Sequence, residues 1–139
     1  MSTLLELVFF VILGVSVSAR YRKRTTRSFW NFRGVVTCVT GNTASLYFNY
    51  GCYCGLGGSG NPVDEIDSCC QTHDLCYQAL SQNRLWAYFT HYSYECVDGH
   101  ARCGEENSDL AYTLCLCDVD AAYCFSQQKY PAWKPACEI

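Results

Sequence analysis

The sequence predicts one small, mainly α-helical domain that is cross-linked by disulfide bonds and contains two long helices, an N-terminal helix and a small β-hairpin. Three observations support this prediction. Twelve of the 139 residues are cysteine, a density typical of disulfide-rich domains. Helix signals follow Asn61 and recur from about Ser108. The length of the chain is that of a single domain.

Residues 1–19 are interpreted as a secretory signal peptide. Leu4–Val17 is mostly apolar, and Val17 and Ala19 satisfy the small-residue rule for signal cleavage. The segment lacks a basic residue and contains Glu6, so a signal anchor is the alternative. The apolar run is too short and too interrupted to span a bilayer comfortably. We therefore expect a secreted, extracellular protein.

Residues 20–27, "RYRKRTTR", hold five of the ten basic residues of the chain. A soluble basic arm is one interpretation. The position after a signal peptide and before the cysteine-rich part favours a short propeptide, cut after Arg27 or after Arg24. The mature domain is then residues 28–139.

The charge of the mature domain limits its partners. Ser28–Ile139 keeps five basic and twelve acidic residues, a formal net charge of −7. Nucleic-acid binding needs clustered Lys and Arg, so we expect no nucleic-acid partner. The same charge argues against strong electrostatic attraction to anionic membranes.

The cysteines are expected to form six disulfide bonds, because their number is even and the chain carries an export signal. Structural zinc bound within "CCQTHDLC" is the alternative. Cysteine spacing alone leaves the pairing open.

The first helix is expected to start near Ser28, with the apolar side chains of "SFWNFRGVV" on one side. Cys38–Gly51 is predicted to be irregular and Gly51–Gly60 to be a loop. The first long helix is predicted from about Pro62 to past Leu80. Asn61 is a candidate N-cap and Pro62 a candidate first helical residue.

The second half of the chain is predicted to contain the hairpin and the second long helix. "HYSYEC" and "GHARCG" have alternating aromatics bounded by glycines, which is typical of a hairpin. Apolar residues recur every three or four positions between Ser108 and Cys124, which predicts a helix. The tail is expected to be a loop attached through Cys137.

The stretch "YGCYCGLGGSGNPVDEIDSCCQTHDLCY" places a glycine-rich loop beside a helix that carries His73 and Asp74. Glycines let a backbone turn tightly with its carbonyls directed inward. Carbonyl and carboxylate oxygens are the ligands that Ca²⁺ prefers, and Asp74 could supply a carboxylate. A plain turn and a phosphate-binding loop remain as alternatives.

His73 is a candidate general base if a carboxylate fixes its tautomer. Asp118 is a plausible partner, because it directly follows Cys117 on the second long helix. No serine or thiol nucleophile is evident. A water nucleophile, a histidine base and a metal electrophile suit hydrolysis of an ester. A purely structural histidine is the alternative.

The quoted stretch resembles the calcium loop and active-site helix of secreted phospholipase A2 of the pancreatic and elapid-venom type. "HYSYEC" and "LCLCDVDAAYCFS" match later segments of that family, so the resemblance covers Ser28–Cys137. The motif "CCxxHDxCY" is long and specific. The resemblance implies the phospholipase A2 fold, with two long antiparallel helices, an N-terminal helix, a calcium loop and a small hairpin.

The resemblance also implies the metal site. One Ca²⁺ would be held by the backbone carbonyls of Tyr53, Gly55 and Gly57 and by the carboxylate of Asp74.

The catalytic roles follow from the same resemblance. It implies that His73 is the general base, that Asp118 orients it, and that Tyr77 and Tyr92 complete the hydrogen-bond network. The Gly55 N–H would stabilise the oxyanion.

The resemblance implies a disulfide pairing as well: Cys38–Cys96, Cys52–Cys137, Cys54–Cys70, Cys69–Cys124, Cys76–Cys117 and Cys103–Cys115. One further bridge that is common in the family is missing here together with both of its cysteines. The segments "TGNTASLYFN" and Cys76–Cys96 are shorter than in pancreatic forms.

The function that the resemblance implies is calcium-dependent hydrolysis of the sn-2 acyl ester of glycerophospholipids, giving a lysophospholipid and a free fatty acid. The enzyme would act as a monomer at a phospholipid membrane or micelle surface. Candidate membrane contacts are Phe29, Trp30, Leu46 and Leu56. A catalytically silent relative that acts as a binding protein or toxin-like ligand is the alternative, and an inert matrix scaffold has no supporting feature.

Overall fold

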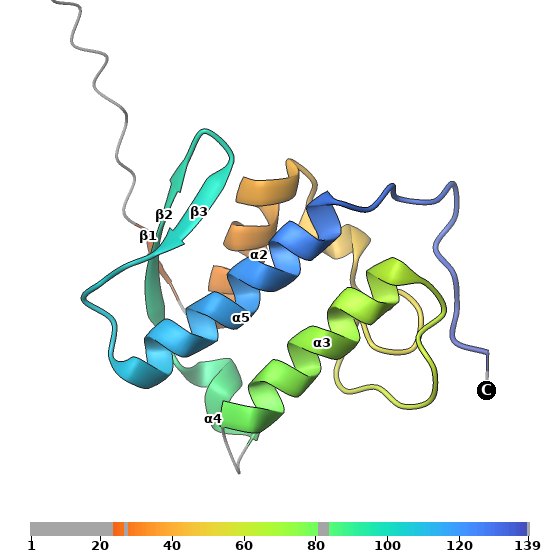
Figure 1. Ribbon diagram of the computed structural model, residues 1–139, viewed down its shortest axis with the longest axis horizontal. Coiled ribbons are helices and arrows are strands. Elements are labelled where there is room, and N and C mark those ends of the chain that lie inside the picture. Colours follow the sequence, from red (N-terminus) through yellow and green to blue (C-terminus); the bar gives the residue numbers. More distant parts are fainter. Residues whose placement is uncertain (1–23, 27, 81–83, 139) are drawn as a thin grey trace, which may run out of the picture.

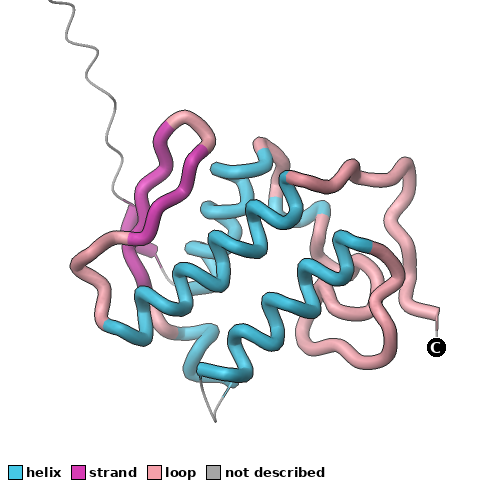
Figure 2. Tube along the Cα trace, viewed as in Figure 1, coloured by secondary structure: helices cyan, strands magenta, loops and turns pink. Residues whose placement is uncertain are grey.

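A computed structural model describes residues 24–26, 28–80 and 84–138. The expected signal peptide and part of the expected propeptide lie outside the described residues, and so do the side chains of 24–29. Figures 1 and 2 show a mainly helical molecule with one small sheet at its edge. The predicted fold class is confirmed.

Two long helices form the centre of the fold, α3 (Glu65–Leu80) and α5 (Asp109–Ser126). They lie side by side and run in opposite directions (Figure 1). Two disulfide bonds join them, Cys69–Cys124 and Cys76–Cys117. The cysteines on each helix are two turns apart and therefore share one face. The earlier cysteine of α3 pairs with the later cysteine of α5, and this crossed pairing fixes the antiparallel arrangement.

The N-terminal helix α2 (Ser28–Thr40) packs against α5. Val35 and Val36 are fully buried, whereas Trp30 is 55% exposed. The guanidinium of Arg33 lies over the Trp30 ring at 5.1 Å from its centroid. Trp30 is therefore a surface residue and not part of the core. A 3-10 turn, η1 (Ala44–Leu46), lies in the segment that was predicted to be irregular.

Helix α3 begins at Glu65, three residues later than predicted. Asp64 occupies the capping position instead of Asn61, since its carboxylate accepts the N–H of Asp67 at 2.9 Å. A carboxylate at this position satisfies a free N–H of the first turn. Pro62 consequently lies in the loop.

The predicted hairpin is formed by β2 (Tyr92–Val97) and β3 (His100–Cys103). Its two-residue turn has φ values of 50° at Asp98 and 79° at Gly99. Two consecutive positive φ values suit the right-handed twist of a hairpin, and they favour an Asp-Gly pair.

Two elements were not predicted. Strand β1 (Arg24–Thr26) pairs antiparallel with β2, with Thr26 opposite Tyr92, although these residues belong to the expected propeptide. The short helix α4 (Arg84–Phe89) lies between α3 and β2.

All twelve cysteines are paired, and the six bonds are those that the resemblance implied. The tail has no helix and is held to the glycine-rich loop by Cys52–Cys137 and by the hydrogen bond from Gly51 N–H to the Pro135 carbonyl at 3.0 Å. In the part of the chain that the structure describes, no helix combines the length and apolar character needed to cross a membrane.

Candidate functional site

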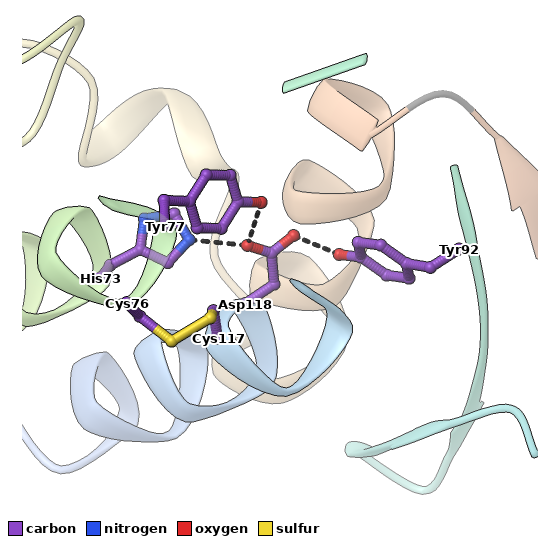
Figure 3. A network of polar contacts seen from close by, with 6 residues as sticks. All are labelled: His73, Cys76, Tyr77, Tyr92, Cys117 and Asp118. Atoms are coloured by element: carbon purple, nitrogen blue, oxygen red, sulfur yellow. Dashed lines mark hydrogen bonds and ion pairs between the residues drawn. A yellow bond between two sulfur atoms is a disulfide. The ribbon is translucent and has the colours of Figure 1, made fainter. Parts of the chain in front are cut away.

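His73 on α3 and Asp118 on α5 face one another across the two central helices (Figure 3). The distance from His73 Nε2 to Asp118 Oδ1 is 2.6 Å. The Cys76–Cys117 bond lies beside this pair, one helical turn after His73 and directly before Asp118. The disulfide therefore holds the two helices at a separation at which the histidine and the carboxylate meet.

Asp118 is fully buried and accepts hydrogen bonds on both of its oxygens. The Tyr77 hydroxyl donates to Oδ1 at 2.7 Å, and the Tyr92 hydroxyl donates to Oδ2. Because an ionised carboxylate only accepts, His73 carries its hydrogen on Nε2. The Nδ1 nitrogen is then the one that can take up a proton.

Burial raises the pKa of Tyr92 well above 10.0, and the adjacent Asp118 charge and hydrogen bond raise it further. The Tyr92 hydroxyl therefore stays protonated over the physiological pH range. It remains a donor to Asp118.

Aromatic rings fix the plane of the imidazole. Phe32 stacks on His73 with ring centroids 4.6 Å apart and an interplanar angle of 13°. The Tyr77 ring lies 4.5 Å from the imidazole on a tilted plane. The His73 side chain keeps 11% of its surface exposed, so a ligand can reach it.

His73 opens into a cavity of about 330 Å³. Apolar side chains form much of its wall, among them Phe32, Tyr47, Phe48, Leu56, Tyr88 and Phe125. Tyr53, Gly55 and Asp74 also line it. The wall of the cavity is thus largely apolar and also includes the His73 imidazole and Asp74.

The candidate metal ligands line the same cavity as His73, with one exception. Tyr53, Gly55 and Asp74 line the main cavity, whereas Gly57 lines an adjoining hollow that it shares with Gly55. Gly57 has a φ of 82°, a value that favours glycine.

The donor set consists only of oxygen atoms, namely backbone carbonyls and one carboxylate, which is the chemistry that Ca²⁺ prefers. No three His, Cys, Asp or Glu side chains cluster as metal ligands among the described residues. A site built from carbonyls and one side chain does not require such a cluster.

The Gly55 N–H, the expected oxyanion donor, donates to the Tyr53 carbonyl at 2.9 Å. Both groups belong to the expected site, one as the donor and the other as a metal ligand. For both roles to operate together, the Gly55 N–H must turn from Tyr53 toward a substrate oxygen.

Several residues of the cavity wall did not emerge from the sequence, and neither did Asp67, whose carboxylate accepts the Tyr53 N–H. Phe32 shares an apolar helix face, and nothing in that pattern marks a contact with His73. Tyr88 lies on α4, which was not predicted. Asp67 belongs to the acidic run "DEID", and a run of acids at a helix start is usually explained by the helix dipole.

The chain is similar in sequence to several phospholipases A2. The family model described as Phospholipase A2 matches residues 29–134. The phospholipase A2 of Oryctolagus cuniculus is 47% identical over 109 residues, which cover 73% of this chain and 76% of the relative. That of Bos taurus is 40% identical over 124 residues, or 84% and 86% of the two chains. The acidic phospholipase A2 E of Naja oxiana is 45% identical over 103 residues, or 73% and 87%.

Proposed function

The chain belongs to the phospholipase A2 family of ester hydrolases, and we propose that it is a secreted, calcium-dependent enzyme that hydrolyses the sn-2 acyl ester of glycerophospholipids. The products are a lysophospholipid and a free fatty acid. The observation that supports this proposal most strongly is the 2.6 Å contact between buried Asp118 and His73, whose imidazole lines a largely apolar cavity. The cavity suits an acyl chain, and the histidine suits activation of water.

In the proposed mechanism, His73 Nδ1 accepts a proton from a water molecule as the water oxygen attacks the ester carbonyl carbon. The imidazole becomes positively charged, and the Asp118 carboxylate stabilises that charge through Nε2–H. The bond to the leaving oxygen then breaks, and His73 returns the proton to that oxygen. Proton transfer of this kind typically contributes about 10²–10⁴-fold in rate.

Tyr77 and Tyr92 hold Asp118 by donating to its two oxygens. Phe32 holds the imidazole plane. In the proposal these groups keep Nδ1 directed at the substrate, so that little reorganisation is needed during the reaction.

Ca²⁺ would be held by the carbonyls of Tyr53, Gly55 and Gly57 and by the Asp74 carboxylate. When bound, it would stabilise the negative charge of the substrate phosphate and the negative charge that develops on the carbonyl oxygen. In this proposal the Gly55 N–H would donate to the same carbonyl oxygen of the substrate. The oxygen-only donor set and its place beside His73 support this assignment.

We further propose that residues 1–19 are a signal peptide, that 20–27 are a propeptide, and that the secreted domain 28–139 acts as a monomer at a phospholipid surface. The six disulfide bonds support an oxidising compartment. N-terminal sequencing of the secreted protein is expected to begin at Ser28.

The proposed function is tested by incubating the secreted chain with mixed phospholipid micelles in excess Ca²⁺ and in excess chelator. We expect release of the sn-2 fatty acid in Ca²⁺ and none in chelator. Release of the sn-1 fatty acid would contradict the positional assignment. A folded chain that binds micelles without turnover would favour the silent binding protein.

A further inference from the structure

Asp67 lies in the first turn of α3 and is fully buried. Its carboxylate accepts three backbone N–H groups. Cys52 N–H donates to Oδ2 at 2.7 Å, Tyr53 N–H donates to Oδ1 at 2.7 Å, and Val63 N–H donates to Oδ2 at 2.9 Å. Hydrogen bonds to an ionised acceptor are stronger than those between neutral groups, and burial protects them from competing water.

These three N–H groups belong to the two ends of the glycine-rich loop. Cys52 and Tyr53 lead into the loop, and Val63 leads out of it. One carboxylate therefore fixes both ends against α3. The tip between them is solvent-exposed, with Leu56 87% exposed.

The loop is shaped to admit this carboxylate. Gly51 has a φ of 57°, and a Cβ atom at that position would lie 2.3 Å from Asp67 Cγ and 2.4 Å from Oδ2. Any other residue would push the carboxylate away from its donors. The backbone at Gly51 thus allows the close approach on which the three hydrogen bonds depend.

In the proposed mechanism the Tyr53 carbonyl binds Ca²⁺. The N–H of the same residue donates to the Asp67 carboxylate. From this contact we infer that Asp67 is a positioning residue for the Ca²⁺ site. Its carboxylate orders the loop before the metal binds. The inference rests on the proposed function, because it presumes that the loop carbonyls bind Ca²⁺. Asp67 touches neither substrate nor metal in this assignment, and it acts through the backbone of Cys52, Tyr53 and Val63.

The test uses Asp67→Asn in the full disulfide-bonded domain. Asparagine fills the same space but has only one acceptor oxygen, and its NH₂ group would face a backbone N–H. The Cys54–Cys70 and Cys52–Cys137 bonds still attach the loop to the protein. Loss of a group that positions a metal ligand typically weakens metal binding about 10–100-fold, and we expect a change in the Kd for Ca²⁺ within that range by calorimetric titration.

Asp64→Asn is the matched control. It also removes a negative charge close to the loop and weakens the cap of α3, but Asp64 accepts none of the three loop N–H groups. We expect its Kd for Ca²⁺ to stay within about threefold of the parent, since only the loop contacts are inferred to set the affinity. If the two variants lose affinity equally, the effect is one of charge or of general stability, and the inference fails.

Amide hydrogen exchange without Ca²⁺ gives a readout that does not depend on metal or turnover. The amides of Cys52, Tyr53 and Val63 are expected to exchange faster in Asp67→Asn than in the parent, while α5 amides are unchanged. A folded Asp67→Asn chain with parental exchange and parental Kd would overturn the inference. A parent that binds no Ca²⁺ would overturn the proposed function, and the exchange data would still decide whether Asp67 holds the loop.

Gly51→Ala provides a second route if Asp67→Asn does not fold. It keeps every charge and every proposed ligand, but its Cβ atom displaces the same carboxylate. We expect weaker Ca²⁺ binding and faster exchange at Tyr53 here too. Parental values in both measurements would contradict the inference.

Discussion

Three side chains fix the orientation of the His73 ring. Asp118 holds Nε2, Phe32 covers one face, and Tyr77 lies beside the ring. This leaves Nδ1 as the reactive atom. A histidine whose role was only structural would show the same packing, so substitution has to separate the two possibilities.

His73→Gln is expected to lower turnover by about 10²–10⁴-fold, because glutamine cannot accept a proton from water near pH 7. Glutamine fills much of the same space and can keep a hydrogen bond to Asp118. Ca²⁺ should still bind, since none of the proposed ligands has changed. Micelle turnover, thermal melting and calcium titration together check this outcome. Substantial turnover by the folded variant would mean that the base lies elsewhere.

Tyr92 makes the free energy of unfolding depend on pH in the alkaline range. Its pKa is raised well above 10.0 by burial and by Asp118, while an unfolded chain would ionise near that value. The folded state therefore favours the neutral phenol. This contribution to the free energy of unfolding is complete below about pH 10 and is lost as the pH rises toward the folded-state pKa.

Tyr92→Phe is accordingly expected to have a lower free energy of unfolding than the parent at pH 8, since the bond to Asp118 is lost. Between about pH 10 and pH 11 its free energy should fall less steeply, by up to about 1.4 kcal/mol per pH unit. Guanidinium unfolding at pH 8, 10 and 11 measures both effects. Parallel curves for the two proteins would show that Tyr92 does not cause the alkaline loss.

Among the helices and strands, α5 shows how disulfide bonds and a helix cap share the task of holding a site residue. Helix α5 carries Asp118, and its N-cap is Ser108, whose hydroxyl accepts the Ala111 N–H at 3.4 Å. The same helix is held by three disulfide bonds, through Cys115, Cys117 and Cys124. The cap therefore adds to a helix that is already fixed by covalent bonds.

Ser108→Ala is expected to lower the free energy of unfolding by about 1 kcal/mol, the usual effect of losing an N-cap. Turnover should be unchanged, because the disulfide bonds keep Asp118 in place. Ser126→Ala at the opposite end of α5 is the control, since its hydroxyl donates to the Tyr123 carbonyl and accepts from the Gln127 side chain in exposed hydrogen bonds. Denaturant titration with intact disulfides is the measurement, and equal losses in the two variants would rule out the cap as the cause.

At the scale of the whole molecule, the question is how the domain meets lipid. Trp30 is 55% exposed, Leu46 is 37% exposed and Leu56 is 87% exposed, and Leu56 also lines the cavity. Tryptophan favours membrane–water interfaces. With a net charge of −7 on residues 28–139, apolar contact is the expected source of affinity.

Trp30→Ala is expected to weaken binding to zwitterionic phospholipid vesicles by roughly tenfold, which corresponds to about 1.4 kcal/mol. Trp133→Ala is the matched control, because Trp133 is 78% exposed, lies in the tail and does not line the cavity. Vesicle sedimentation measures both. If the two variants bind alike, this surface does not contact the membrane.

Local residue patterns in the sequence were enough to predict several elements of this protein. The periodicity from Ser108 predicted α5 to within two residues of its end, and the alternating aromatics bounded by glycines in "HYSYEC" and "GHARCG" predicted the hairpin, because strands and amphipathic helices need particular residues at particular positions. The motif around His73 carried the family, and with it the six disulfide pairs, which spacing alone left open.

Features that depend on contacts between residues far apart in the sequence became evident only in the tertiary structure. The stacking of Phe32 on His73, the Tyr88 wall from α4 and the pairing of β1 with β2 leave no local signal. Asp67 is the clearest case. In the sequence it is one acid among several, and only the folded chain brings both ends of the loop to its carboxylate. Burying a charge costs free energy unless hydrogen-bond partners surround it. The partners of Asp67 come together only when the chain folds.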